Sequence, residues 1–295
     1  IAAAVVLLSI LLSQMLTRKI STLLTAIRKV RAGAYEHRTH ISGRDEIAQI
    51  GEEFNSLTDR LQTTETLRRR FVSDASHELK TPLAAIRLLT DSILQTDQMD
   101  METVRDFVTD IGSEAERLSR ITEDLLRLTR LDSDLLDAPE TVEVAPVLEQ
   151  VMRMMSLLAQ EKGTELTYRM EENCRVSATK GEVHQVIYNL TDNAVKYSGK
   201  NGKVRVELRH EDRDVVLTVA DNGPGIPEED LPKVFERFYR VDKARSRAAG
   251  GTGLGLSIVQ DTVKKRGGTV SAANRAGGGA VFTVRWPEAE GGDHS

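Results

Sequence analysis

Residues 71–83 (FVSDASHELKTPL) place three reactive groups close together on one predicted helix. His77 is followed directly by the carboxylate of Glu78 and, four positions on, by the hydroxyl of Thr81. At about 100° per residue, His77 lies about 160° from the apolar Leu79, so its imidazole is expected to face solvent. An exposed imidazole can act as a nucleophile, because a carboxylate bonded to one ring nitrogen makes the other more reactive.

The proline within this segment should disturb the helix. Pro82 has no N–H to donate to the carbonyl of Glu78, so a kink or a loosened turn is expected there. The default interpretation of a lone surface histidine is a solvated side chain without a chemical role. We apply that interpretation to the five other histidines, which are His37, His40, His184, His210 and His294.

A second candidate site begins in residues 183–198 (VHQVIYNLTDNAVKYS). Apolar residues at helical spacing predict one buried face, and a polar stripe of Asn189, Asn193 and Lys196 lies about 100° around the helix from it. Two amides and one cation suit a metal-bridged triphosphate. Helix capping and surface solubility are the alternative explanation.

Two glycine-rich segments follow this helix. Asp221 ends the predicted strand DVVLTVA and opens DNGPGIP, where a carboxylate can accept a hydrogen bond from an exocyclic amine. The segment GGTGLGLSIV opens another helix, whose free N–H groups and dipole favour phosphate. Taken alone, each glycine motif is better explained by a tight turn.

The elements that carry these groups fall into a helical first half and a mixed second half. Heptad spacing is interrupted at Gly33 and Gly43, which predicts helix, loop and helix. Its apolar positions are Ile20, Leu23, Ile27, Val30, Ile47, Ile50, Phe54, Leu57 and Leu61. Segments at about 67–94 and from Val104 to Leu125 should form an antiparallel hairpin, whose exposed apolar seam predicts a homodimeric four-helix bundle.

From about Val142 the sequence mixes helices with β-rich runs such as VRVEL and AVFTVRW, which predicts an α/β sandwich of about 145 residues. At the other end, residues 1–16 carry no charge, and basic residues follow them. We interpret this stretch as part of a transmembrane helix with earlier residues missing, and everything after Leu16 as cytoplasmic. A signal-peptide hydrophobic region is the alternative.

Composition excludes several classes of protein. The chain has 295 residues, enough for about two domains. Acidic residues outnumber basic ones 45 to 40, so no overall positive field exists to hold nucleic acid. The single cysteine, Cys174, excludes an internal disulfide framework and a multi-thiolate zinc site.

These motifs resemble those of a known family. The heptad helices, with DEIAQIGEEFN opening the second, resemble the HAMP signal-relay module, although Lys19 stands where that module often has proline. SHELKTPL closely resembles the H-box of sensor histidine kinases. The amide helix and the two glycine segments resemble the N-box and glycine boxes of the Bergerat ATP-binding fold. VFERFYR resembles its F-box, and RVDKARSRAAGGTG resembles its mobile ATP lid.

The resemblance implies roles for individual residues. Asn189 would bind Mg²⁺, and Asn193 and Lys196 would hold phosphates directly or through the metal. Asp221 and Gly225 would read adenine. The remaining residues that the motifs assign to the nucleotide are Tyr197, Gly223, Phe235, Phe238, Gly251, Thr252, Gly253, Leu254 and Gly255.

The implied function is that of a membrane-bound sensor histidine kinase. His77 would attack the γ-phosphate of Mg·ATP, Glu78 would orient His77 and accept its proton, and the phosphoryl group would pass to an aspartate of a response regulator. In family members with the Glu-x-x-Thr pattern, Thr81 would also hold a water for dephosphorylating the regulator; alternatively it only caps a kink before Pro82.

Two rival functions remain at this stage. ATP-hydrolysing relatives of the fold typically carry a glutamate four positions before the helix asparagine that corresponds to Asn193. This chain has Asn189 at that position, so an ATP-hydrolysing function fits less well. A non-catalytic scaffold would not need His77, Asn189 and Asp221 intact. The implied boundaries are a partial transmembrane helix (1–16), a HAMP-like relay (17–66), a phosphotransfer hairpin (67–132), a linker (133–141), the ATP-binding domain (142–288) and a tail (289–295).

Overall fold

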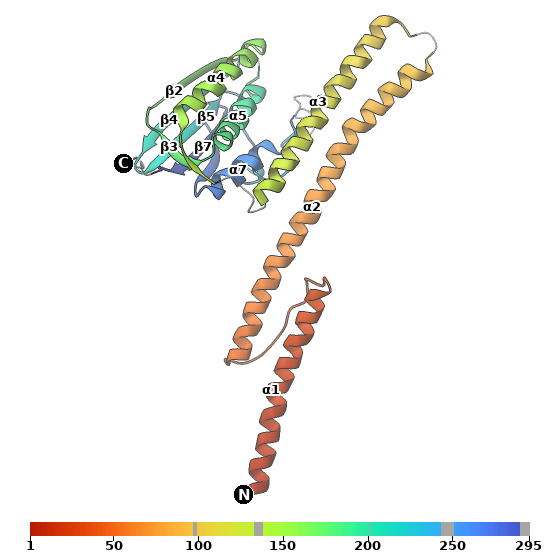
Figure 1. The fold of residues 1–295 in the computed structure, drawn as a ribbon, viewed down its shortest axis with the longest axis vertical. Coiled ribbons are helices and arrows are strands. Elements are labelled where there is room, and N and C mark those ends of the chain that lie inside the picture. The colour runs from red at the N-terminus through yellow and green to blue at the C-terminus, as the bar shows by residue number, and fades with distance from the viewer. Residues whose placement is uncertain (97–98, 133–137, 200, 243–250, 290–295) are drawn as a thin grey trace. The chain divides into compact units, whose positions relative to one another are not determined.

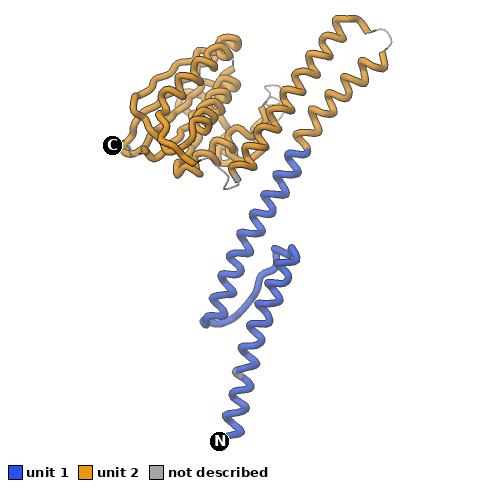
Figure 2. The backbone as a smooth tube through the Cα atoms, in the orientation of Figure 1, with its two compact units in different colours: residues 1–76 blue, residues 77–295 orange. Residues whose placement is uncertain are grey.

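The computed structural model describes residues 1–96, 99–132, 138–199, 201–242 and 251–289. The chain folds as two compact units, residues 1–76 and 77–295 (Figure 2). Three sequence features lie mainly outside the described residues. They are the hairpin turn near Gln98, most of the linker at 133–141 and the centre of the predicted ATP lid at 240–253.

The first unit contains α1 (Ala2–Arg31) and the start of α2 (Glu46–Gln95), which run in the same direction (Figure 1). α1 is long and apolar enough to cross a membrane, judged by length and composition. Asp45 caps α2 by accepting from the Ala48 backbone N–H at 3.0 Å, and it pairs with Lys19 at 2.6 Å. The hydrogen bond from Lys19 lowers the pKa of Asp45.

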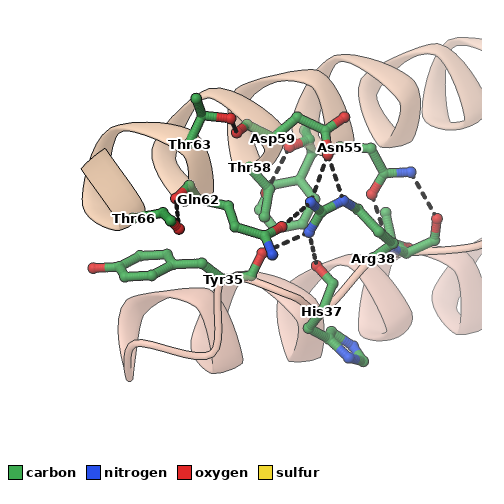
Figure 3. A network of polar contacts seen from close by, with 11 residues as sticks. Tyr35, His37, Arg38, Asn55, Thr58, Asp59, Gln62, Thr63 and Thr66 are labelled. Atoms are coloured by element: carbon green, nitrogen blue, oxygen red, sulfur yellow. Dashed lines mark hydrogen bonds and ion pairs between the residues drawn. The ribbon is translucent and has the colours of Figure 1, made fainter. Parts of the chain in front are cut away.

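The connector between these helices is held to α2 by side chains. The Asn55 amide donates to the Thr39 carbonyl and accepts from the Thr39 N–H, both at 2.9 Å. The Arg38 guanidinium reaches Asp59 and Gln62 on α2 and two connector carbonyls (Figure 3). The predicted helix–loop–helix is therefore confirmed.

α2 is longer than the sequence analysis expected. It runs without interruption for 50 residues, through the predicted boundary between residues 66 and 67. No glycine or proline lies near that boundary, and Glu65 pairs with Arg68 and Arg69 along the helix at 2.9 Å. Pro82 lies inside α2, and the helix continues on both sides of it.

The second unit begins with the C-terminal part of α2, which pairs with α3 (Met101–Asp132) as the predicted antiparallel hairpin (Figure 1). Asp100 caps α3 by accepting from the Thr103 N–H at 2.8 Å. Ile121 and Leu128 are fully buried, and α3 contacts α7 (Gly255–Lys265). The last part of the hairpin therefore packs on the domain that follows it.

That domain is an α/β sandwich, as predicted. A mixed sheet has the strand order β2-β4-β5-β7-β6, with β2 and β4 parallel and the other pairs antiparallel. The helices α4 (Val144–Glu161), α5 (Lys180–Tyr197) and α7 lie on one face of it (Figure 1). The sheet strands are β2 (Glu165–Met170), β4 (Lys203–Glu211), β5 (Asp214–Asp221), β6 (Thr269–Asn274) and β7 (Ala280–Pro287).

Three further elements complete the domain. β1 (Glu140–Glu143) and β3 (Arg175–Ala178) form a separate antiparallel pair, and η1 (Leu231–Lys233) is a short 3₁₀ turn. Thr179 and Glu182 form a reciprocal capping box that begins α5. Arg266, just after α7, binds both oxygens of Glu182 at 2.9 Å, which ties the start of α5 to the end of α7.

Candidate active site

A cavity of about 540 Å³ lies where α5, the end of β5 and the start of α7 meet. It brings together most of the residues that the sequence motifs assign to a nucleotide. Those that line it are Asn189, Asn193, Lys196, Tyr197, Asp221, Gly225, Gly251, Thr252, Gly253 and Gly255. This volume suits a small-molecule ligand.

Asp221 stands at the end of β5, where the sheet ends and the cavity begins. Its carboxylate is only 4% exposed, and Oδ1 accepts from the N–H groups of Gly223 at 2.8 Å and Ala280 at 3.1 Å. Burial raises the pKa of Asp221 above its ordinary value. Among the described residues, Oδ2 accepts no hydrogen bond, so it remains able to bind an amine donor of a ligand.

Two glycines near Asp221 are required by close backbone contacts. A Cβ on Gly223 would lie 2.4 Å from the carbonyl oxygen of Tyr197, and one on Gly279 would lie 2.0 Å from that of Asp221. These distances are far below van der Waals contact. Gly223 does not line the cavity itself. It lets the turn pack against the end of α5 and so fixes the cavity wall.

The segment that opens α7 is shaped by the residues that precede it. Gly253 has φ +74°, and its carbonyl accepts from the Phe238 N–H at 2.9 Å. Phe235 packs edge-on against Phe282 with ring centroids 6.3 Å apart, and Leu254 is fully buried. Phe235, Phe238 and Leu254 were predicted to bind nucleotide. In the structure they lie outside the cavity lining, and Phe238 is bonded through its N–H to the glycine segment.

The polar stripe of α5 faces the cavity as predicted. Asn189 is 8% exposed, and its Nδ2 donates to the Gly255 carbonyl at 3.1 Å. Its Oδ1 accepts from Gln185 Nε2 at 2.9 Å. The Lys196 ammonium is 2.6 Å from Asp192, and both side chains are largely buried. Lys196 therefore brings a positive charge to the cavity wall that one carboxylate already balances.

The sequence analysis missed several residues of the site. Gln185 and Asp192 each lie four positions before a predicted ligand on the same helix, so i,i+4 spacing could have found them. Asp124 had no such signal, because it lies on α3 far along the chain from its partner. Its Oδ2 accepts from the Thr252 hydroxyl at 2.8 Å, and burial raises the pKa of Asp124.

The hairpin contributes one wall of the cavity. Its lining includes four α3 residues, which are Arg120, Glu123, Asp124 and Arg127. Arg127 donates to Gln185 Oε1, and Lys265 of α7 donates to the Leu131 carbonyl at 2.8 Å. Two motifs of the ATP-binding domain, through Gln185 and Thr252, and the end of α7 therefore have a partner on α3.

His77 is exposed on α2, as predicted, and it does not line the cavity. Its neighbour Glu78 is engaged elsewhere. Glu78 Oε2 accepts from Arg240 at 2.9 Å and from Arg117 at 3.4 Å, and both arginines are over nine-tenths buried. No hydrogen bond joins Glu78 to His77 among the described residues. The predicted orienting role of Glu78 therefore stays a prediction.

Thr81 is also exposed, one turn after His77. Its hydroxyl donates to the His77 carbonyl at 3.2 Å, within the helix. This bond leaves the lone pairs of the hydroxyl oxygen available on the surface that carries His77.

Three family models match the chain one after another. The HAMP domain model matches residues 11–63, and the His Kinase A (phospho-acceptor) domain model matches residues 67–134. The model of the histidine kinase-, DNA gyrase B-, and HSP90-like ATPase matches residues 178–290. The order agrees with the sequence interpretation.

Individual proteins show the same similarity. The signal transduction histidine-protein kinase BaeS of Escherichia coli K12 is 31% identical over 279 residues, which cover 94% of this chain and 59% of BaeS. The chain thus spans less than two thirds of this relative. Full-length ShkA in complex with AMPPNP is 29% identical with a TM-score of 0.55, covering 76% of this chain and 46% of ShkA.

A third similarity concerns the fold. The histidine kinase ThkA, solved in complex with the response regulator protein TrrA, has a TM-score of 0.61 at 23% identity, covering 84% of this chain and 69% of ThkA. Because a HAMP domain, a phospho-acceptor domain and a histidine-kinase-type ATPase domain follow one another in this order, the protein belongs to the bacterial sensor histidine kinases.

Proposed function

We propose that this chain is the membrane-proximal and catalytic part of a sensor kinase that phosphorylates itself on His77 with ATP. The phosphoryl group then passes to an aspartate of a response regulator. One observation carries the proposal: the same chain has an exposed histidine on a dimerisation helix and a cavity whose buried carboxylate, Asp221, can hold an adenine amine. An ATPase or a chaperone would not need the exposed histidine, and a scaffold would not need the cavity with its buried carboxylate.

The chemical step follows from the groups available. A ring nitrogen of His77 attacks the γ-phosphorus of ATP, the bond to the bridging oxygen breaks, and ADP leaves. Glu78 accepts the proton that His77 loses. The transition state of such transfers is loose, so the protein contributes mainly by positioning and by charge neutralisation.

The ATP-binding domain holds the substrate at both ends. Asp221 accepts the adenine amine, with Gly225 beside it in the cavity lining. The N–H groups at the start of α7 and the ammonium of Lys196 donate hydrogen bonds to the phosphates. Asn193, half-buried one turn before Lys196 on α5, adds an amide toward the same region.

The residues present fit a magnesium ion carried by the substrate. Among the described residues, no group of three or more His, Cys, Asp and Glu side chains could hold a metal. Mg²⁺ is often held by one or two protein oxygens plus substrate phosphates, and the Asn189 amide oxygen suits that pattern. When bound, the ion would neutralise phosphate charge and align the γ-phosphate.

Phosphorylation requires a change from the arrangement described above. His77 does not line the cavity, and Glu78 is held by Arg117 and Arg240. We infer that the ATP-binding domain moves relative to the hairpin, and that Glu78 is released from Arg240 when it does. This movement is the step that a signal from the HAMP domain would control.

We expect two protein partners, a second copy of the chain and a response regulator. Val72, Leu83 and Leu94 are each more than half exposed on α2 and recur every eleven residues, so they form one apolar stripe. A second copy of the chain would cover it, which gives a homodimer. The response regulator would bind near His77, as ThkA was solved with TrrA.

We place the protein in the cytoplasmic membrane, with the residues after α1 in the cytoplasm. α1 supplies an apolar helix, and the basic residues Arg28, Lys29 and Arg31 lie in its last turn. We expect no nucleic-acid partner, because the net charge is −5.

The test is labelling with γ-³²P ATP. His77→Gln should abolish acid-labile, base-stable phosphorylation while ATP affinity stays unchanged. His40→Gln, which replaces an exposed histidine of the connector, should behave like the parent. Undiminished labelling of the His77 variant would exclude the proposed phosphoacceptor.

A further inference from the structure

Three residues from two helices form a chain of hydrogen bonds along the cavity wall. Gln185 and Asn189 lie one turn apart on α5, and Gly255 is the first residue of α7. Gln185 Nε2 donates to Asn189 Oδ1 at 2.9 Å, and Asn189 Nδ2 donates to the Gly255 carbonyl at 3.1 Å. Both ends of the Asn189 carboxamide are therefore held by the protein.

The direction of this chain of hydrogen bonds is fixed by its last member, the Gly255 carbonyl. A backbone carbonyl can only accept a hydrogen bond, so the group of Asn189 that faces Gly255 must be the NH₂. The amide oxygen of Asn189 then faces Gln185, and Gln185 has to present its own NH₂. Any other orientation of either amide would bring two acceptors or two donors together.

The other end of the chain of hydrogen bonds, at Gln185, independently requires the same orientation of the amides. Arg127 of α3 donates to Gln185 Oε1, and a guanidinium can only donate. Gln185 thus has its oxygen toward α3 and its NH₂ toward Asn189. An obligate donor at one end and an obligate acceptor at the other leave a single arrangement of both amides.

On this basis we propose that Gln185 is a positioning residue for the metal-binding oxygen of Asn189. The proposal rests on the assignment of Asn189 as a ligand of Mg²⁺ made above. The amide oxygen has two lone pairs. One accepts from Gln185, which holds the carboxamide still and leaves the other for the ion. Partners that orient a metal ligand in this way commonly change metal affinity by about 10- to 100-fold when removed.

The test is the Mg²⁺ dependence of nucleotide binding by the full chain. Gln185→Met keeps the size of the side chain and removes the donor. ATP binding is measured by displacement of trinitrophenyl-ATP while Mg²⁺ is titrated, and again in EDTA. We expect the Mg²⁺ concentration for half-maximal enhancement to rise about ten-fold, with ATP affinity in EDTA unchanged within two-fold.

Two further variants make the outcome specific. Gln150→Met changes an exposed glutamine on α4 and should leave both measurements unchanged. Asn189→Ala should raise the Mg²⁺ requirement, and adding Gln185→Met to it should have no further effect, because the residue that Gln185 positions is gone.

The failures are distinguishable. If Asn189→Ala leaves the Mg²⁺ requirement unchanged, the metal-ligand assignment in the proposed function is wrong. If Asn189→Ala raises it and Gln185→Met does not, only the positioning role of Gln185 is overturned. Equal effects of Gln185→Met in the parent and Asn189→Ala backgrounds would overturn it as well. A general loss of affinity in EDTA would contradict it too, since positioning of a metal ligand does not act without metal.

Discussion

The surface around His77 and the cavity around Asp221 are built in different ways. His77, Glu78 and Thr81 lie within five positions on one helix, and His77 and Thr81 are exposed. The cavity draws on α3, α5, the end of β5 and the start of α7, and its central carboxylate is buried. The proposed nucleophile therefore needs only a helix, whereas the proposed nucleotide site needs the whole domain to fold.

This difference predicts how each region responds to substitution. Changes near His77 should alter one activity and spare the fold, because exposed side chains have few contacts to lose. Changes in the cavity should alter binding, and in some positions also stability, because backbone segments from distant parts of the chain meet there.

The largest effect is expected from Asp221→Asn. The variant retains an acceptor for Gly223 and Ala280 but loses the charge that strengthens a bond to the adenine amine, about 1.5 to 3 kcal/mol. ATP affinity measured by calorimetry should fall roughly 10- to 150-fold. His77→Gln should leave that affinity unchanged. Equal ATP affinity of Asp221→Asn and the parent would contradict this prediction, because the charge of the buried carboxylate would then play no part in binding.

Gly223→Ala should show that backbone packing sustains the cavity. The new methyl group would overlap the Tyr197 carbonyl oxygen, so the turn after β5 has to shift, at a cost of about 1 to 3 kcal/mol in unfolding free energy. Both the melting temperature and ATP affinity should fall. Gly112→Ala is the matched control, because nothing lies within 4 Å of that position on α3 and alanine favours helix. A stable Gly223 variant with normal ATP binding would refute this account.

Thr81→Ala tests the surface around His77. The hydroxyl is not needed to move phosphate from ATP to His77, so autophosphorylation should stay within a few-fold of the parent. Dephosphorylation of the regulator should slow at least ten-fold, about 1.4 kcal/mol in barrier, if the hydroxyl orients the attacking water. A phospho-regulator decay assay measures this. A parallel loss of both activities would mean that Thr81 shapes the helix before Pro82.

The smallest effect concerns stability and pH. A carboxyl whose pKa is higher in the folded state than in the unfolded state destabilises the fold when ionised; the penalty is full above the folded pKa and absent below the unfolded one. Burial raises the pKa of Asp221 above 3.8. Nucleotide-free Asp221→Asn should therefore have a higher melting temperature than the parent near neutral pH.

This advantage should shrink as the pH falls toward 4, which thermal melts across a pH series will detect. Asp110→Asn, an exposed change on α3, should show no such trend. An advantage for Asp221→Asn that grows on acidification would contradict the assigned direction of the shift.

Much of the architecture was predictable from local patterns. Heptad spacing predicted the helix–loop–helix and the hairpin, and the mixture of helices with β-rich runs predicted the α/β sandwich. The expected start of a helix near residue 67 was not seen, because α2 continues from Glu46 to Gln95. Nothing in the intervening sequence stops a helix, and a boundary between family motifs is not a boundary in the backbone.

The nucleotide motifs were predictable as a set but not in their individual roles. Asp221 and the α5 stripe line the cavity, whereas Phe235, Phe238 and Leu254 lie outside its lining. Sequence spacing tells which residues share a helix face, but it does not tell which side of a loop faces a ligand. Gln185 and Asp192 could have been found from their i,i+4 spacing to Asn189 and Lys196, whereas Asp124 had no such signal.

By itself, the order of residues determined the features that depend on near neighbours: the exposure of His77 on its helix, the proline in α2, the helix of amides and the glycine turns. These follow from periodicity and backbone sterics over a few residues. Only the tertiary structure decided that Asp124 and Arg127 form part of the nucleotide cavity and that Glu78 is held by Arg117 and Arg240. Such contacts join side chains far apart in the sequence, and they depend on how the hairpin packs against the domain, for which no local pattern carries a signal.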